Sequence, residues 1–379
     1  MSSNSKAIDY RFKILYAVAM LMVVAGHSSG GGMSLSFGDW FPYSGLHLPL
    51  FAFGSGYFYK DQSENKVLSY IGGKVKSLII PMYIYTFVYG FIAHLLHQIG
   101  FGIGKELSFR NLVIAPISDG HQFAYNMGGW FVVPLFMVQI AYVLLRKLLK
   151  RIKGDIPEYF FFIVTVTVGI VGNYYLGCHG PLEGRWLVIG RFVYFMPFYG
   201  LGVFYNRCLE KYDTISSLIY LPLLFTAKLA IIVHYGRASR YIVSWFRDFH
   251  DGPITPILAG FIGIAVWMRI ATMLEPVIGR SRLVRVIADN TYSIMMNQFA
   301  GFMLVKLFFG WMSTFIASFP EFDWYAFKSD IWWYYNPWQV DHTMIIYPIA
   351  GIAFSVLVQK TIDRGKSLIL RRVREALKA

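Results

Sequence analysis

Two histidines at the edges of apolar segments are the side chains in this sequence best suited to proton transfer. His27 ends the apolar run at residues 12–27, and His47 begins another one twenty residues later. An imidazole titrates near neutral pH, and ionisable groups in membrane spans usually serve function, so both are candidates for a general base. Each could instead be an interfacial histidine that only hydrogen-bonds its neighbours. The pattern indicates proton-transfer chemistry at a membrane, with His27 as the stronger candidate.

The composition is that of a membrane protein. Hydrophobic residues make up 56% of the 379 residues and charged residues 15%, against roughly 25% charged residues in soluble domains. The mean hydropathy is +0.48. Aromatic residues cluster beside polar ones, for example at residues 332–335, as they do at the headgroup level of a bilayer. No signal-peptide cleavage site follows the first apolar run, so we expect it to remain as a helix.

We expect an all-α fold, a multi-pass membrane bundle of about ten transmembrane helices in a single domain over residues 1–379. Each apolar run counted is long enough to cross roughly 30 Å of hydrocarbon. The second and sixth runs are short and contain Gly and Pro, which neighbouring helices or a polar cavity must accommodate. No internal repeat or linker divides the chain. The expected spans are residues 12–29, 44–60, 77–98, 128–147, 158–177, 190–206, 214–235, 253–273, 291–318 and 343–361.

Lys and Arg are distributed unevenly between these spans. With the N-terminus inside, the cytoplasmic segments carry 25 of the 35 Lys and Arg residues and the outer segments carry eight. We therefore expect both termini in the cytoplasm, with a basic cytoplasmic tail at 362–379. Topology and anionic lipids then explain most of the net charge of +14, and nucleic-acid binding is not expected. Cys178 and Cys208 fall on opposite sides and lack ligand neighbours, so neither a disulfide nor a metal site is expected.

Six segments, in order, resemble the acyltransferase-3 family of integral membrane acyltransferases. Tyr16-Ala-Val-Ala-Met-Leu-Met-Val-Val-Ala-Gly-His27 is similar to its first helix, which ends in the presumed catalytic histidine. His47-Leu-Pro-Leu-Phe-Ala-Phe-Gly-Ser55-Gly-Tyr-Phe resembles its "HMPLFFFLSGFLF" stretch. The other four segments are Lys74-Val-Lys-Ser-Leu-Ile-Ile-Pro81, Gly129-Trp130-Phe-Val-Val-Pro134-Leu-Phe, Arg191-Phe-Val-Tyr-Phe-Met-Pro197-Phe-Tyr-Gly-Leu-Gly202 and Asn290-Thr-Tyr-Ser-Ile-Met-Met-Asn297-Gln298.

The sequence departs from the family pattern at three places. Tyr16 stands where the family usually has an arginine, eleven positions before the histidine. Lys74 and Ser77 replace a pair of arginines, with Lys76 as a possible substitute. Asn297 or Gln298 occupies the position of a late histidine. A diverged or inactive member therefore remains an alternative.

The resemblance implies acyl transfer, usually of acetyl and sometimes of succinyl, from a cytoplasmic coenzyme A thioester to a hydroxyl outside. Acyl-CoA would be a co-substrate, with no bound cofactor. The acceptor would be a surface polysaccharide or its lipid-linked precursor, at a bacterial cytoplasmic membrane and with polysaccharide-export machinery as a candidate partner. The donor phosphates should meet basic cytoplasmic residues, although the positive-inside rule alone would also place these there. The candidates are Lys74, Lys76, Arg146, Arg280 and Arg282.

An acceptor hydroxyl needs a positioned base, and the neutral imidazole of His27 is the best one available. We expect His27 to remove the proton while the oxygen attacks the thioester carbonyl, whose oxyanion needs a hydrogen-bond donor. Ser55, Tyr16 and Asn297 are the donor candidates, although Ser55 could instead allow close helix packing. A covalent acyl-histidine is the variant mechanism.

The outer segments 99–127, 236–252 and 319–342 contain aromatic rings and carboxylates that could form a surface to bind the acceptor. The aromatic rings could instead form the belt that membrane proteins place at the interface. We expect Trp130 to pack in the bundle or sit at an interface rather than to bind an acyl chain. Arg191 is either an outer-leaflet anchor or a contact for an anionic acceptor. His47 and Gln298 are the remaining residues that we expect to bind the acceptor or the oxyanion. The surface includes Asp119, His121, Arg237, Arg240, Asp248, Asp251, Asp323, Asp330, Asp341 and the tryptophans at 324, 332, 333 and 338.

Two other classes of function fit part of the pattern. A transporter or flippase for a lipid-linked glycan would also have about ten helices and interrupted spans. Such a protein should show repeat symmetry or midplane charges, and only Lys228 and Lys306 fall within spans. A non-catalytic partner of a polysaccharide synthase would explain the missing family arginine.

Overall fold

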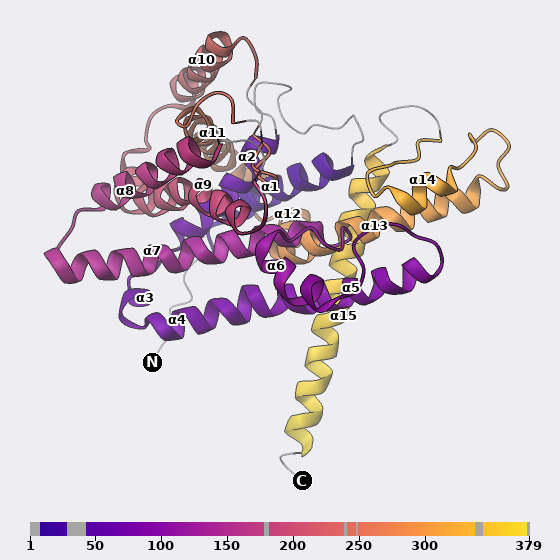
Figure 1. Cartoon of the computed structure of the whole chain (residues 1–379). Helices are drawn as coiled ribbons and strands as arrows, with labels where there is room; N and C mark the ends of the chain where they lie inside the picture. The colour runs from indigo at the N-terminus through magenta and orange to yellow at the C-terminus, as the bar shows by residue number, and fades with distance from the viewer. Residues whose placement is uncertain are drawn as a thin grey trace.

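The computed structural model describes residues 8–28, 43–177, 182–238, 241–247, 249–337 and 344–376. These residues form helices and connecting loops, and the β-structure among them is one isolated bridge between Ile242 and Arg247. The expected all-α fold is confirmed (Figure 1). Cys178 lies outside the described residues.

Eight helical segments in the described part of the chain are long and apolar enough to cross a membrane. They confirm a multi-pass membrane bundle. Their bounds are Tyr10–Ser28 (α1), Val67–Gln98 (α4 and α5, joined by a π-helical stretch), Met127–Lys153 (a 3₁₀ turn and α7), Glu158–Gly177 (α8 and its extension), Gly184–Tyr212 (α9 and its extension), Ser217–Tyr235 (α10), Thr255–Ile278 (α11) and Thr291–Met312 (α13).

Two of the ten expected spans are helices that fall outside this set of eight. The span expected at 44–60 is α2, Tyr43–Tyr57, which has only 15 residues and contains Pro49. The span expected at 343–361 is the first part of α15, Ile346–Ala376, which continues as one helix into the basic tail. Short helices complete the chain: α3 Gln62–Asn65, α6 Ala115–Ser118, α12 Arg282–Asp289 and α14 Trp324–Ser329.

The centre of the bundle contains α1, α2, α9 and α13. The helices α2 and α9 approach so closely that a Cβ added at Gly56 would collide with the Tyr199 carbonyl. In the same way, a Cβ at Gly202 would collide with the Phe53 carbonyl. Small residues that let helix backbones meet are typical of membrane bundles, because dispersion contacts replace the hydrophobic effect there. This contact holds α2 against α9.

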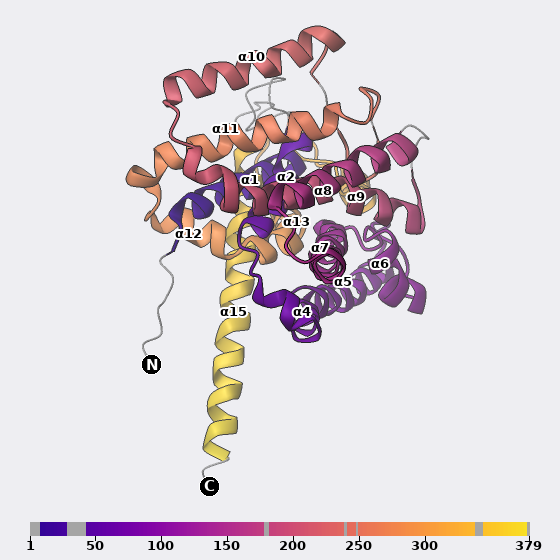
Figure 2. The same cartoon turned by 90° about the vertical axis from the view of Figure 1, so that its left-hand side faces the viewer.

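Apolar side chains cover the outside of the bundle. The helix α10 packs on α11 at the edge of the molecule (Figures 1 and 2) and exposes Leu218 and Val233 at 88% and 71%. Exposed apolar faces of this extent match lipid and not water. The helix α15 first packs on α13, where Gly351 meets Gly301, and its basic half then extends away from the bundle (Figures 1 and 2).

Candidate active site

His27 lies in the last turn of α1, in a pocket of aromatic rings. Its ring centroid lies 5.1 Å from that of Phe299 on α13 and 5.8 Å from that of Trp332 in the loop after α14. The half-buried imidazole has a buried Nδ1 atom without a hydrogen-bond partner. The backbone carbonyl of His27 accepts a hydrogen bond from the Tyr334 hydroxyl. The ring is therefore held by packing, while one nitrogen remains unpaired and can accept a proton.

Gln298, and not Asn297, faces His27 from α13. The Gln298 side chain is fully buried beside the imidazole, and its Oε1 atom has no hydrogen-bond partner. Asn297 is engaged elsewhere, because its Oδ1 accepts from the Tyr89 hydroxyl at 2.8 Å and its Nδ2 donates to the Ser293 carbonyl at 2.8 Å. Of the two candidates for the late histidine position, Gln298 is thus the one at the site.

His121, in the loop between α6 and the 3₁₀ turn before α7, brings a second imidazole to this region. Its ring stacks on Trp245 with a centroid distance of 4.2 Å and an interplanar angle of 20°. Its Nδ1 lies 3.5 Å from Nη2 of Arg191, and its Nε2 is buried without a partner. The same loop continues into Tyr125, which stacks on Tyr89, the residue that binds Asn297.

The environment of His121 keeps its imidazole neutral. Burial is the main cause that lowers the pKa of His121 from 6.5 to about 2, and the charges of Arg191, His27 and Lys105 lower it further. The loop leads into the 3₁₀ turn Met127–Phe131, where a Cβ at Gly128 would collide with the Met295 carbonyl on α13, one helix turn before Gln298.

Arg191 and Trp130 support the loop that carries His121. The Arg191 side chain is only 1% exposed, and its guanidinium lies 4.4 Å from the centre of the Trp130 ring. It donates from Nη1 to the Asp119 carbonyl at 2.9 Å and from Nη2 to the Ser244 carbonyl. Arg191 is therefore buried and joins two loops, a position that does not fit an anchor at the lipid headgroups. Trp130 forms one wall of the same cluster.

Tyr16 and Ser55 contact residues other than His27. Tyr16 precedes His27 by eleven residues, so it lies roughly 16 Å away along α1. Its ring stacks on Phe51 at 5.7 Å. The Ser55 hydroxyl accepts a hydrogen bond from Gln139 at 2.9 Å. His47 is buried near the start of α2.

Of the expected donor-binding residues, Arg280 lies beside the first turn of α1. Arg280 lines an open hollow of about 540 Å³ with Tyr10 and Glu275, and its guanidinium lies 5.8 Å from the Tyr10 ring. Arg282 is exposed at the start of α12. Lys76 is exposed, and Lys74 is half-buried with its amine 5.3 Å from the Tyr70 ring. These cations form no ion pair with a carboxylate in the described part of the chain.

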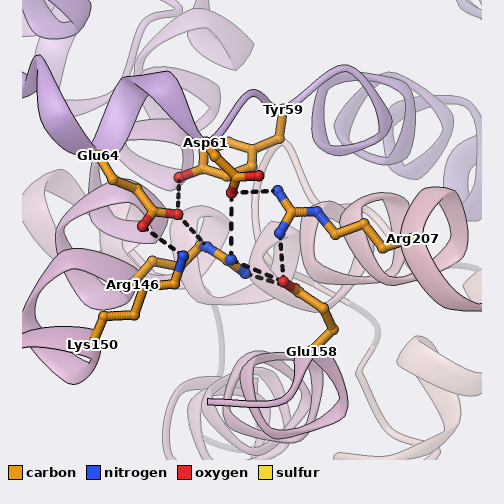
Figure 3. Close-up of polar contacts among 7 residues, drawn as sticks. All are labelled: Tyr59, Asp61, Glu64, Arg146, Lys150, Glu158 and Arg207. Carbon is orange, nitrogen blue, oxygen red and sulfur yellow. Dashed lines mark hydrogen bonds and ion pairs between the residues drawn. The ribbon is translucent and has the colours of Figure 1, made fainter. Parts of the chain in front are cut away.

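Arg146, the fifth basic residue considered for the donor, belongs to an ion-pair network (Figure 3). It is 1% exposed and donates to Glu64 at 2.7 Å and to Glu158 at 2.6 and 2.9 Å. Further contacts involve Tyr59, Asp61, Lys150 and Arg207. Three cations thus meet three carboxylates, and Arg146 has no free edge for a phosphate. The network ties α3 to α7, α8 and the end of α9.

The structure adds Tyr334, which the sequence did not single out, and gives two expected acceptor-surface residues a more specific place. His121 and Trp332 were expected only as members of a broad acceptor surface on the outer segments. The sequence signal that could have marked His121 is its place nine residues before Trp130, in a loop that leads into a family-like motif. No pattern in the sequence connects Tyr334 with His27.

Comparison with known proteins gives one result that covers nearly the whole chain. The model of a protein family described as an acyltransferase domain, of the acyltransferase-3 type, matches residues 9–358. A search of curated proteins and a search of solved structures gave no match.

Proposed function

The chain belongs to the acyltransferase-3 family and is a membrane acyltransferase, and from this premise we propose that it transfers an acyl group from acyl-CoA to a hydroxyl outside the membrane. The acyl group is acetyl or succinyl. The acceptor is a surface polysaccharide or its lipid-linked precursor, and the membrane is the bacterial cytoplasmic membrane with both termini inside. The observation that carries the proposal is the unpaired, buried Nδ1 of His27 among Gln298, Phe299 and Trp332.

In the proposed reaction, His27 acts as the general base. Nδ1 of His27 takes the proton of the acceptor hydroxyl as its oxygen attacks the carbonyl carbon of the thioester. The C–O bond forms, the C–S bond breaks, and the coenzyme A sulfur leaves and takes the proton from His27. The products are an acyl ester and free coenzyme A, so the imidazole returns to its neutral state. General-base catalysis of this kind contributes about 10²- to 10⁴-fold.

The donor enters from the basic end of the bundle in this proposal. Lys74, Lys76, Arg280 and Arg282 attract its phosphates, and the hollow beside Tyr10 gives them a place to bind. Tyr10 and His27 lie seventeen residues apart on α1, which corresponds to roughly 26 Å. The pantetheine arm must therefore extend into the bundle to bring the thioester to His27.

The acceptor reaches His27 from the loop side. Trp332 is 44% exposed while it also packs on the His27 ring, so one aromatic surface faces both the site and the exterior. Aromatic faces of this kind suit the apolar faces of sugar rings. The distribution of Lys and Arg supports this end as the extracytoplasmic one.

Replacement of His27 by alanine tests the proposal. We expect His27→Ala to remove detectable acyl transfer at wild-type membrane abundance, since loss of a general base costs about 10²- to 10⁴-fold. His47→Ala serves as the matched control and should lose less. The readout is mass spectrometry of surface glycans from cells with and without the protein, which identifies acyl group and acceptor by one mass increment. Wild-type acylation by His27→Ala would remove the proposed base.

A further inference from the structure

The hydrogen-bond geometry of His121 fixes which of its ring nitrogens carries the proton. A guanidinium has only donors, so the Arg191 Nη2 atom 3.5 Å from Nδ1 requires that Nδ1 act as the acceptor. The proton of the neutral ring must then be on Nε2. His121 therefore presents an N–H donor at Nε2, and this atom is buried without a partner in the described structure.

The surroundings of His121 leave this donor to a ligand. The carboxylate of Asp119 is turned to the backbone N–H of His121 at 3.1 Å and lies 4.0 Å from the Lys105 amine. Trp245 and Trp130 lie against the faces of the ring and offer no acceptor. A buried N–H without an acceptor costs roughly 1–3 kcal/mol, so such groups in native proteins usually have a functional explanation.

The location of the donor matches the proposed chemistry. The loop of His121 leads into the 3₁₀ turn whose Gly128 meets the Met295 carbonyl on α13, one helix turn before Gln298, and Gln298 faces His27. The alternatives considered from the sequence are less suited. The Nδ2 atom of Asn297 already donates to the Ser293 carbonyl, Ser55 lies beside Gln139 of α7, and Tyr16 lies roughly 16 Å from His27 along α1. A site for acyl transfer needs both a base and a donor for the oxyanion.

We propose that His121 is a second catalytic histidine, whose Nε2–H donates a hydrogen bond to the thioester carbonyl oxygen as this oxygen gains negative charge. This inference rests on the proposed function. His121 keeps its proton throughout: the electron pair of the carbonyl moves to the oxygen when the acceptor attacks and returns when the C–S bond breaks. Proton transfer stays with His27. Arg191 is a positioning residue that holds His121 in the required tautomer.

Two substitutions separate hydrogen-bond donation from packing. His121→Phe keeps an aromatic ring against Trp245 and removes the N–H, whereas His121→Gln keeps an N–H donor. His94→Phe on α5 is the matched control for a histidine outside the site. Membrane vesicles that contain each variant at equal abundance receive labelled acyl-CoA, acetyl or succinyl according to which one the wild type uses. The readouts are kcat and KM for the thioester and label in the vesicle polysaccharide.

We expect His121→Phe to lower kcat by about 10²- to 10³-fold with little change in KM, as for loss of one oxyanion donor. His121→Gln should recover most of the rate, and His94→Phe should match the wild type. Wild-type kcat in His121→Phe would overturn the inference, and so would a loss in His121→Gln as large as that in His121→Phe. His27→Ala in the same assay tests the proposed base separately, because an inactive His27→Ala beside an active His121→Phe would reject this inference alone.

Discussion

The hydroxyl of Tyr334 donates a hydrogen bond to the backbone carbonyl of His27, across 307 positions of the sequence. This bond fastens the loop after α14 to the last turn of α1. Trp332, two residues earlier in the same loop, packs on the His27 ring and on Phe299. The loop thus forms one wall of the candidate site.

Tyr334→Phe removes this bond and keeps the ring. A single hydrogen bond contributes about 0.5–1.5 kcal/mol, so we expect acyl transfer to fall by up to about tenfold as the wall of the site loosens. Tyr335→Phe is the matched control, since the Tyr335 hydroxyl binds the Pro320 carbonyl and not α1. Transfer rates for both variants at equal abundance provide the measurement. Equal rates in the two variants would contradict the role of the Tyr334 bond.

Lys306 supports the same loop from α13. Its fully buried amine donates to the Ile331 carbonyl at 2.7 Å and lies 4.4 Å from the centre of the Tyr334 ring. We expect Lys306→Met to lower transfer, and the effects of Lys306→Met and Tyr334→Phe to be non-additive because both act on one loop. A double-mutant cycle of transfer rates measures this coupling. Strict additivity would show that Lys306 acts independently of the loop.

The ion-pair network around Arg146 predicts a stability effect without a donor-binding effect. Arg146→Met leaves the buried Glu64 and the half-buried Glu158 without the buried Arg146 guanidinium, and removal of one partner of a buried pair typically costs about 3–5 kcal/mol. Lys150→Met should cost less, because the Lys150 side chain is 34% exposed. Thermal unfolding in detergent and KM for acyl-CoA are the measurements. A raised KM with unchanged unfolding would instead make Arg146 a donor contact.

Neutralisation of the four expected donor-binding residues tests the donor side. We expect the quadruple change of Lys74, Lys76, Arg280 and Arg282 to Gln to raise KM for acyl-CoA. The difference from the wild type should shrink between about 50 and about 300 mM salt, because salt screens exposed charges. The same charge change on the projecting half of α15, at Lys360, Arg364, Lys366 and Arg371, is the control. Unchanged donor affinity would leave the four residues as topology signals.

The low pKa of His121 predicts a pH-dependent stability. Unfolded histidine titrates near pH 6.5, whereas burial, aided by Arg191, His27 and Lys105, lowers the folded pKa to about 2. Below pH 6.5 the unfolded state binds a proton that the folded state does not, so stability falls by up to about 1.4 kcal/mol per pH unit. The contribution is fully present above pH 6.5. Thermal unfolding of the wild type should weaken more than that of His121→Phe on acidification, and equal slopes would contradict the assignment.

The helical content and the membrane character could be read from the sequence, because long apolar runs dictate both. The number of spans was harder to predict. The α2 segment is too short to be recognised by length, and it sits in the bundle because Gly56 lets it touch α9. The apolar part of α15 runs without a break into a charged segment, so its end had no marker in the sequence.

The site could be predicted only in part. His27 stays a prediction from its place at the end of an apolar run, whereas the choice between Asn297 and Gln298 depended on helix rotation. Neighbouring residues on a helix point about 100° apart, and the sequence did not fix which one faces α1. The role of His121 depends on Arg191 and Trp245, which lie 70 and 124 positions away in the chain. Such contacts arise from tertiary packing and leave no local pattern.

The backbone contact between α2 and α9 leaves no room for a side chain at two positions. A Cβ at Gly56 would lie 2.0 Å from the Tyr199 carbonyl oxygen, and a Cβ at Gly202 would lie 2.0 Å from the Phe53 carbonyl oxygen. Even an alanine at either position would therefore force the two backbones apart. The position of the short helix α2, which carries both His47 and Ser55, thus depends on two hydrogen atoms in place of side chains.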